Sequence, residues 1–246
     1  MIMNPNKFRN QYIAKYTFLI FIITLGLNKV VCAQLSFVLE ENTPSNVLAV
    51  QDLFSVDTKS TLMSDGTNAY KKGDYEAALT AFKKVTEMNP DYYDAWIGIG
   101  NSLFSLSRFN DAIEAFDATN EINPNLFEVW YNKGLALYFI CKYDNAIKCF
   151  DNALILKPEY YEILNIKGMS LNKLTKYDEA INAYEIALSV KPDFFDAIYN
   201  MACTYAFMGD KEKVSNTLSK LIQLNTSYKE TLSKDPILKD YDILRQ

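Results

Sequence analysis

The apolar side chains between residues 59 and 228 recur at intervals of three and four residues, which is the spacing of one face of a helix. Residues 127–160 carry two such stripes: Val129, Trp130, Gly134 and Leu137, then Ala146, Ile147, Phe150, Ala153, Leu154 and Leu156. The sequence Lys-Tyr-Asp at residues 142–144 separates them. Pro158 ends the second stripe, because proline lacks the N–H and disfavours helix in the residue before it. This stretch predicts a hairpin of two helices.

The hairpin pattern returns with a period of 34 residues. Three residue types keep this period in four copies: Gly66, Gly100, Gly134 and Gly168; Ala78, Ala112, Ala146 and Ala180; and Pro90, Pro124, Pro158 and Pro192. The five predicted units are 59–92, 93–126, 127–160, 161–194 and 195–228. A fixed period of this size indicates stacked repeats, since one hairpin cannot bury both of its faces alone. The predicted fold is an all-α solenoid.

The recurring small and aromatic residues predict how the hairpins close. Gly134 lies midway along the first predicted helix of its unit, and Ala146 lies near the start of the second, where the axes should approach most closely. A larger side chain at either position would overpack the contact, at a cost of about 1–3 kcal/mol. Two sets of rings recur on the second helices and should fill the space between hairpins: Tyr75, Phe109, Tyr143 and Tyr177, and Phe82, Phe116, Phe150 and Tyr184.

The pattern of Trp130, Gly134, Leu137, Ala146, Phe150, Ala153 and Pro158 resembles the tetratricopeptide repeat, and the resemblance covers about residues 59–228. It implies a right-handed α-solenoid whose first helices line a concave surface that binds an extended peptide or a partner helix. The end repeats depart from the pattern, as terminal repeats do where one side faces water. In the fifth unit, Ala202 stands for the glycine and Thr226 for the proline. Residues 229–246 are predicted to form a capping helix, broken at Pro236.

Positions 2, 5, 9, 12 and 13 of a unit share one helical stripe, and they define a predicted partner-binding groove. Its candidate residues are aromatic, amide-bearing or apolar: Asn101, Phe104, Tyr131, Leu135, Tyr138, Phe139, Asn165, Met169, Asn172, Tyr199 and Phe207. Exposed aromatic clusters of this kind mark binding sites. The alternative is that adjacent repeats or the terminal cap cover some of these rings.

Acidic residues stand at position 2 of four units: Asp94, Glu128, Glu162 and Asp196. One interpretation is an acidic rim to the groove. The other is local, because each residue lies at a predicted helix start, where the helix dipole favours a carboxylate by about 0.3–1 kcal/mol. The local effect alone is sufficient to explain them.

The N-terminal 33 residues match a secretory signal peptide or an uncleaved signal anchor. Residues 1–15 are polar and basic, residues 16–27 are almost wholly apolar, and Val31-Cys32-Ala33 places short side chains before Gln34. Twelve apolar residues are few for a helix that spans a bilayer. We therefore expect an extracytoplasmic protein, either secreted or held at a membrane by this segment. Residues 34–58 are predicted to be a linker, with residues 47–54 as a candidate short helix.

Composition narrows the function. The whole chain has a net charge of −5, and because residues 1–33 hold four basic and no acidic side chains, the remainder is at −9. Such an acidic body disfavours nucleic acid as a partner. The chain has no histidine, and Cys141, Cys149 and Cys203 have neither metal-site spacing nor the pattern of a disulfide framework.

With no catalytic motif, cofactor site, metal site or small-molecule substrate indicated, the prediction is a non-enzymatic scaffold for protein–protein interaction. Its partner is expected to be a protein or peptide. A structural assembly module of a membrane-associated or envelope complex is the alternative, and an exported enzyme is a third.

Overall fold

A computed structural model of the protein describes the backbone of residues 44–241 and the side chains of residues 58–241. The predicted signal peptide or anchor and residues 34–43 of the predicted linker lie outside this range. The chain divides into two compact units, residues 1–61 and 62–246. Of the first unit, the described residues 44–61 are helical and belong to α3 (Pro44–Lys71), which continues into the second unit.

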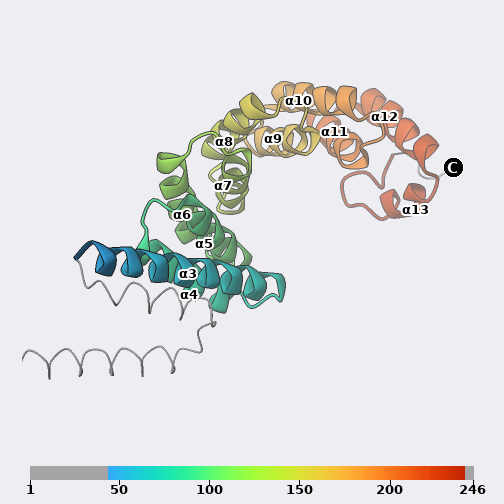
Figure 1. The fold of residues 1–246 in the computed structure, drawn as a ribbon. Coiled ribbons are helices and arrows are strands. Elements are labelled where there is room, and N and C mark those ends of the chain that lie inside the picture. The colour runs from blue at the N-terminus through green and yellow to red at the C-terminus, as the bar shows by residue number, and fades with distance from the viewer. Residues whose placement is uncertain (1–43, 242–246) are drawn as a thin grey trace, which may run out of the picture. The chain divides into compact units, whose positions relative to one another are not determined.

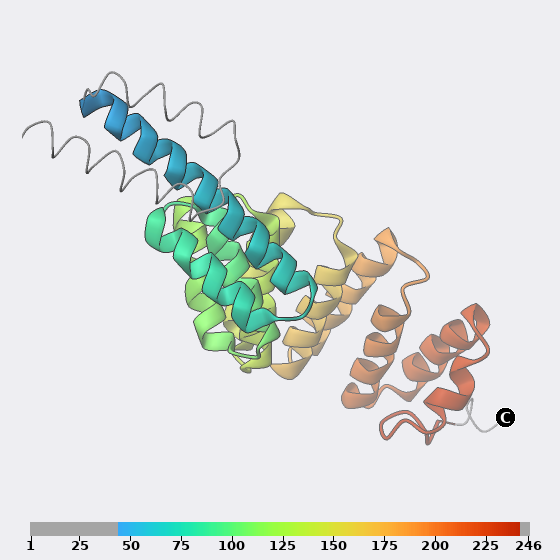
Figure 2. The ribbon, with the colours of Figure 1, turned by 60° about the horizontal axis from the view of Figure 1, so that its bottom comes forward.

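The second unit contains the end of α3 and all the later helices. These are α4 (Tyr75–Met88), α5 (Tyr93–Ser105), α6 (Phe109–Ile122), α7 (Phe127–Phe139), α8 (Tyr143–Leu156), α9 (Tyr161–Lys173), α10 (Tyr177–Val190), α11 (Phe195–Met208), α12 (Lys211–Leu224) and α13 (Tyr228–Leu232). Between residues 44 and 241 the structure has no strand. The helices pack as consecutive pairs, each of which contacts the next (Figures 1 and 2). This confirms the predicted all-α solenoid of helical hairpins.

Aromatic rings on the second helices pack against glycines on the first helices, as their shared period predicts. A Cβ added to Gly134 would lie 2.5 Å from the ring of Phe150, which is fully buried. Phe82 also reaches the next hairpin, because a Cβ at Gly66 or at Gly98 would lie 2.7 or 2.6 Å from its ring. The absence of a side chain at these glycines therefore makes room for the ring inside and between hairpins.

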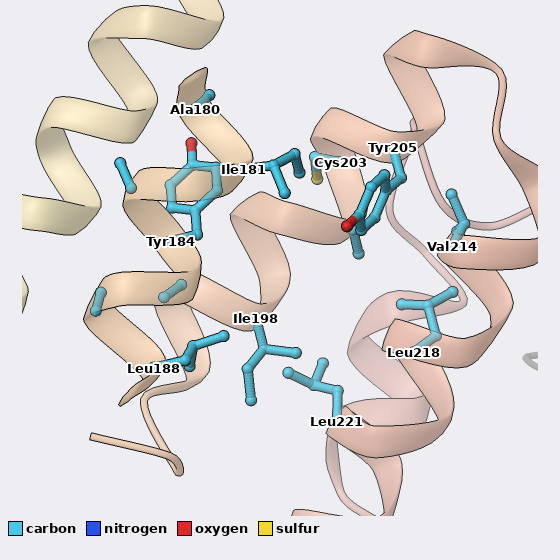
Figure 3. Close-up of a cluster of buried hydrophobic side chains, with 14 of the residues drawn as sticks. Ala180, Ile181, Tyr184, Leu188, Ile198, Cys203, Tyr205, Val214, Leu218 and Leu221 are labelled. Carbon is cyan, nitrogen blue, oxygen red and sulfur yellow. The ribbon is translucent and has the colours of Figure 1, made fainter. Parts of the chain in front are cut away.

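The last two repeats share one apolar core. Leu188 of α10 lies beside Ile198 of α11, and Leu221 of α12 lies on the other side of Ile198 (Figure 3). Tyr184 and Leu218 belong to the same cluster. Leu232 and Leu238 of the C-terminal segment are buried in the same cluster. This segment therefore covers the apolar end that the final hairpin would otherwise expose.

The turn inside each hairpin uses a residue in the left-handed backbone region. Gly73 and Gly209 have φ values of 81° and 78°, and the equivalent Ser107, Cys141 and Thr175 have values of 59°, 61° and 60°. Cys141 thus lies at the inter-helix turn. A residue with a side chain is strained in this region, by about 1–2 kcal/mol.

The two ends of the repeat region differ from the prediction. Helix α3 begins at Pro44, so the helix in residues 44–58 is longer than the short helix at residues 47–54 that was considered for the linker, and it continues into the first repeat. Proline is well tolerated at a first helical position, and the sequence has no further proline or glycine before Gly66.

At the other end, the predicted capping helix is reduced to the five residues of α13, and turns occupy most of residues 233–241. Pro236 has no N–H to continue a helix. Instead, the Asp235 carboxylate accepts hydrogen bonds from the backbone N–H groups of Ile237 and Leu238, at 2.8 and 2.9 Å. This turn allows Leu238 to reach the core without a helix.

Candidate partner-binding surface

All the predicted groove residues belong to the first helices of the repeats, α5, α7, α9 and α11. In Figure 1, α7, α9 and α11 lie on one side of the helix stack and α8, α10 and α12 lie on the other. We call the surface formed by positions 2, 5, 9, 12 and 13 of α5, α7, α9 and α11 the first-helix face. The structure determines which of its side chains are free and which already have partners.

The amide side chains of this face join neighbouring repeats. Asn132 Nδ2 donates to Asn101 Oδ1 at 2.9 Å, which joins α7 to α5, and Asn200 Nδ2 donates to Asn165 Oδ1 at 3.0 Å, which joins α11 to α9. Asn172 Nδ2 donates to Thr204 Oγ1 at 2.8 Å across the same α9–α11 junction. The predicted residues Asn101, Asn165 and Asn172 therefore align the repeats.

Asn165 has only 8% of its surface exposed. Sequence reasoning missed its partner Asn200 and the equivalent Asn132. Both occupy position 6 of a unit, and that coincidence was the available signal.

An apolar patch lies between these amide junctions. It comprises Tyr131, Leu135 and Tyr138 of α7 and Met169 of α9, and we call it the central patch. Each of these side chains is partly buried, and burial raises the pKa of the Tyr131 and Tyr138 hydroxyls.

Neighbouring rings hold the central patch in place. Tyr131 stacks on Phe127 with ring centroids 6.2 Å apart, and Tyr138 meets Tyr143 edge-on at 5.4 Å. Position 6 is an asparagine in α7 and in α11, where it bonds to the preceding first helix. In α9 the same position is Ile166, so the α7–α9 junction has no such amide pair. The central patch is thus a surface of aromatic and aliphatic side chains whose rings are held in place by their neighbours.

Two rings of the first-helix face are largely exposed. Phe139 is 55% exposed and Phe207 is 52% exposed. Phe139 stacks on Phe109 of the preceding repeat at 5.1 Å, with Phe104 edge-on to both rings. Phe207 stacks in the same way on Tyr177, at 6.4 Å.

Phe109 and Tyr177 therefore support the exposed rings from below. Their 34-residue recurrence predicted rings that fill the space between hairpins, and it gave no sign of this contact with an exposed ring.

The C-terminal segment covers part of the fifth repeat. The Tyr199 hydroxyl donates to Asp235 Oδ2 at 2.7 Å. Burial, and then this hydrogen bond to a carboxylate, raise the pKa of Tyr199. Tyr199 thus has a partner within the chain, which is the alternative that the sequence left open for such rings.

Charge on the first-helix face is acidic at its helix starts. Of the three lysines in α7 and α9, two are engaged behind the face, since Lys133 pairs with Asp117 and Lys167 Nζ lies 2.6 Å from Asp151 Oδ1. Each pair joins a first helix to the second helix of the preceding repeat. The third lysine, Lys173, is exposed at position 13 of α9. Asp94 and Asp196 have no hydrogen bond or ion pair with any residue that the structure describes, and they remain exposed.

Two of the three cysteines among the described residues are buried. Burial raises the pKa of the Cys149 and Cys203 thiols to about 11, so both are protonated at neutral pH. Within residues 58–241, no three His, Cys, Asp or Glu side chains are grouped so that they could hold a metal ion. In the part of the chain that the structure describes, no helix is both long and apolar enough to cross a membrane.

Profiles of the tetratricopeptide repeat match most of the chain. They match residues 65–126, 127–160, and 161–194 with 195–228. The ranges 127–160, 161–194 and 195–228 have the same boundaries as the last three units of the 34-residue period, and the range 65–126 ends where the second unit ends. No curated protein matches the chain.

Several solved structures share the fold. A crystal structure of MamA protein is 25% identical with a TM-score of 0.67, and the match covers 71% of this chain and 95% of that one. A structure of MamA from Desulfovibrio magneticus RS-1, residue 41 to the end, is 19% identical with a TM-score of 0.67 and coverages of 70% and 97%. YrrB, described as a TPR protein with an unusual peptide-binding site, is 22% identical with a TM-score of 0.62 and coverages of 67% and 85%.

Proposed function

Because the chain belongs to the tetratricopeptide repeat family, we propose that it is a non-enzymatic scaffold that holds an extended peptide or a partner helix against its first-helix face. The family and the solved relatives support a protein-interaction role. The choice of the first-helix face rests on the arrangement of this chain's own side chains.

The observation that carries the proposal is the central patch with the exposed Phe139 beside it. Tyrosine and other aromatic side chains dominate binding hot spots when they are held rigidly and lie next to apolar groups. Tyr131 and Tyr138 are held by neighbouring rings, so little conformational entropy is lost when a partner covers them. A partner therefore gains apolar contact there at low ordering cost.

An extended peptide fits the spacing of the first helices. Packed helices lie about 8–10 Å apart. An extended peptide in the polyproline II conformation has three residues per turn and rises by about 3.1 Å per residue, so side chains three residues apart lie on one face and would meet successive first helices. The amide groups of Asn101 and Asn172 flank the central patch, and their unused donors and acceptors are available to a peptide backbone.

The test is peptide selection followed by substitution in the central patch. Short random peptides displayed on phage are selected on the whole chain, and their affinities are then measured with the double variant Tyr131→Ala/Tyr138→Ala. We expect affinity to fall by about a hundredfold, as for the loss of two hot-spot residues. Far-ultraviolet circular dichroism should show unchanged helix content.

Ile155→Ala is the matched control, because Ile155 is 75% exposed on the second helix α8. Its binding should equal that of the unaltered chain. Peptides that bind the double variant as tightly as the unaltered chain would remove the first-helix face from consideration.

We also propose that the scaffold acts outside the cytoplasm. The support is residues 1–33, with a basic start, an apolar run and short residues before Gln34. Expression in a secreting host, with mass spectrometry of the product, should show a chain that begins at Gln34 or an intact chain in the membrane fraction. An intact chain found only in the cytoplasmic fraction would contradict export.

A second candidate, an assembly module, is favoured by a row of exposed apolar residues. Met88, Ile122, Val190 and Leu224 end four of the second helices and are 37–44% exposed. Such a repeated apolar row suits lateral contact with another protein or another copy. Light scattering on the purified chain distinguishes the two, since a monomer at all concentrations argues against self-assembly.

A further inference from the structure

A small pocket lies at the fifth-repeat end of the first-helix face. Its volume is about 180 Å³, and it lies between α11 and the C-terminal segment. The lining residues that matter here are Phe195, Asp196, Tyr199, Tyr228 and Asp235. Pockets for whole ligands usually enclose about 300–1,000 Å³. This pocket therefore suits a single side chain better than a free small molecule.

The walls of the pocket are aromatic and its charge is negative. The rings of Phe195 and Tyr228 stack at 4.4 Å, and the Tyr199 hydroxyl is bound to Asp235. Asp196 contributes an exposed carboxylate that has no partner among the described residues. No basic side chain lines the pocket. Aromatic faces and carboxylates together attract a cation.

The third and fourth repeats show what the equivalent position holds elsewhere in this chain. In the third repeat, Lys157 Nζ lies 4.0 Å from the ring centroid of Phe127 and 3.6 Å from Glu128 Oε1. Phe127 and Glu128 occupy the positions of Phe195 and Asp196, and Tyr160 occupies that of Tyr228, with its ring 4.8 Å from Phe127.

The fourth repeat has the same arrangement. Lys191 Nζ lies 4.7 Å from the ring centroid of Tyr161 and 5.6 Å from that of Phe194. Glu162, at position 2 of the unit, is one of the carboxylates that interact electrostatically with Lys191. Two repeats thus place a lysine of the chain over an aromatic pair beside a carboxylate.

The fifth repeat retains the rings and the carboxylate but lacks the lysine. Residue 225, at the position of Lys157 and Lys191, is asparagine. The C-terminal segment adds Asp235 and so brings a second carboxylate to the site. The cation that the third and fourth repeats supply from within is therefore missing at a site that has two carboxylates.

We propose that this pocket receives a lysine or arginine side chain of the bound peptide, which takes the place that Lys157 and Lys191 fill in their own repeats. This proposal rests on the proposed function, because the pocket adjoins the first-helix face through Asp196 and Tyr199. The peptide would then be fixed at one end by its cation and along its length by the central patch.

The first test uses n-butylammonium and n-butylguanidinium as probes, with n-butanol as the neutral control. Aromatic NMR signals of Phe195, Tyr199 and Tyr228 in the whole chain should shift with either cation and not with the alcohol. Equal responses to cation and alcohol, or cation responses elsewhere only, would overturn the proposal.

Two variants sharpen this test. Asn225→Lys restores the internal cation, so we expect it to abolish the response to butylammonium while the hairpin stays folded, as the third and fourth repeats do. Asp196→Asn should weaken the response by about threefold to tenfold, the range of one cation contact. Asp94→Asn, at the same position of the second repeat, should change nothing. An Asn225→Lys variant that still binds the cation would refute the equivalence with Lys157.

The selected peptides separate this proposal from the proposed function. Peptides with a lysine or arginine should bind Asn225→Lys about tenfold more weakly than the unaltered chain. Copies with norleucine in place of the basic residue should not distinguish the two. If peptides need Tyr131 and Tyr138 but ignore Asn225→Lys, the pocket proposal fails and the scaffold stands. If butylammonium binds the pocket but no peptide needs the central patch, the proposed peptide-binding face fails and the cation site in the pocket stands.

Discussion

The hairpin interior and the first-helix face follow the same 34-residue period, but they use it in opposite ways. In the interior of the first four repeats, an aromatic ring recurs: the ring that faces a glycine is Phe82, Phe116, Phe150 or Tyr184. On the first-helix face, position 12 changes from Phe104 to Tyr138, Asn172 and Ala206 along the chain. The same ring-to-glycine contact therefore recurs inside the hairpins, whereas each repeat has different side chains on the first-helix face.

This difference separates what specifies the fold from what specifies a partner. Interior positions are constrained by close packing, which tolerates few changes of volume. Face positions contact water, or each other, and can vary at little cost to folding. The variation along the face gives each repeat a distinct contact, so that a bound segment has one preferred position and direction.

The largest expected effect comes from removing an interior ring. Phe150→Ala leaves a cavity beside Gly134, and we expect it to lower the free energy of unfolding by about 3–5 kcal/mol. Urea denaturation followed by circular dichroism measures this. A lower slope of the transition would show in addition that the repeats no longer unfold together.

Phe139→Ala is the matched control, since it makes the same change in the same repeat on the face. Phe139 is 55% exposed, so its removal should cost less than about 1 kcal/mol. Peptide affinity, in contrast, should fall. Equal losses of stability in the two variants would break the distinction between interior and face.

The amide pairs lie on the boundary between the hairpin interior and the first-helix face. Removing one of them should give the second-largest loss of stability. Asn200→Ala removes the donor to Asn165, which is buried and would keep an unpaired carbonyl. The expected loss is about 1–3 kcal/mol in the free energy of unfolding, measured in urea. Asn216→Ala, at an exposed position on α12, serves as control. If Asn200→Ala lowered the free energy of unfolding no more than Asn216→Ala does, the amide pair would not contribute to stability.

The fold could be predicted from the sequence because its main determinants repeat. The glycine at Gly134, the ring at Phe150 and the proline at Pro158 each return every 34 residues, so that chance agreement is excluded. The ends could not be predicted in the same way. Helix α3 starts at Pro44, and the C-terminal turn depends on hydrogen bonds of Asp235, and neither feature repeats.

The candidate site could be placed on its helices but not read in detail. Helical spacing assigned Tyr131, Tyr138 and Phe139 to one stripe, and the structure has them on α7. It could not show that Asn165 bonds to Asn200, or that Tyr199 bonds to Asp235. Such pairs depend on contacts between repeats, about 35 residues apart in sequence, that a stripe on one helix does not specify.

Alkaline pH offers a third comparison of interior with surface. Burial raises the pKa of Cys149 and Cys203 to about 11, whereas an unfolded thiol titrates near about 8.5. A raised pKa in the folded state gives stability that is complete below the unfolded pKa and is lost as the pH rises to the folded one. Between about pH 8 and about pH 10, each buried thiol should lower the free energy of unfolding by about 1–2 kcal/mol.

Urea denaturation at the two pH values measures this loss. Cys203→Ala should remove its share of the pH dependence, while Cys141→Ala, at an exposed position, should leave the dependence as it is. Since tyrosines and lysines titrate in the same range, the informative quantity is the difference between variant and unaltered chain. The same slope in both variants would contradict a protonated interior thiol.

The smallest effect concerns the hairpin turns, where the repeats agree in backbone but not in residue. Thr175 has a φ of 60° where the fifth repeat has Gly209 at 78°. A β-branched residue is strained in this region, whereas glycine enters it freely but loses more entropy on folding. Thr175→Gly should therefore raise the free energy of unfolding by about 0.5–1 kcal/mol, and the reciprocal Gly209→Thr should lower it by more. If Thr175→Gly instead destabilised the chain, the turn would owe its conformation to contacts of the threonine side chain, and it would belong with the variable face and not with the repeated interior.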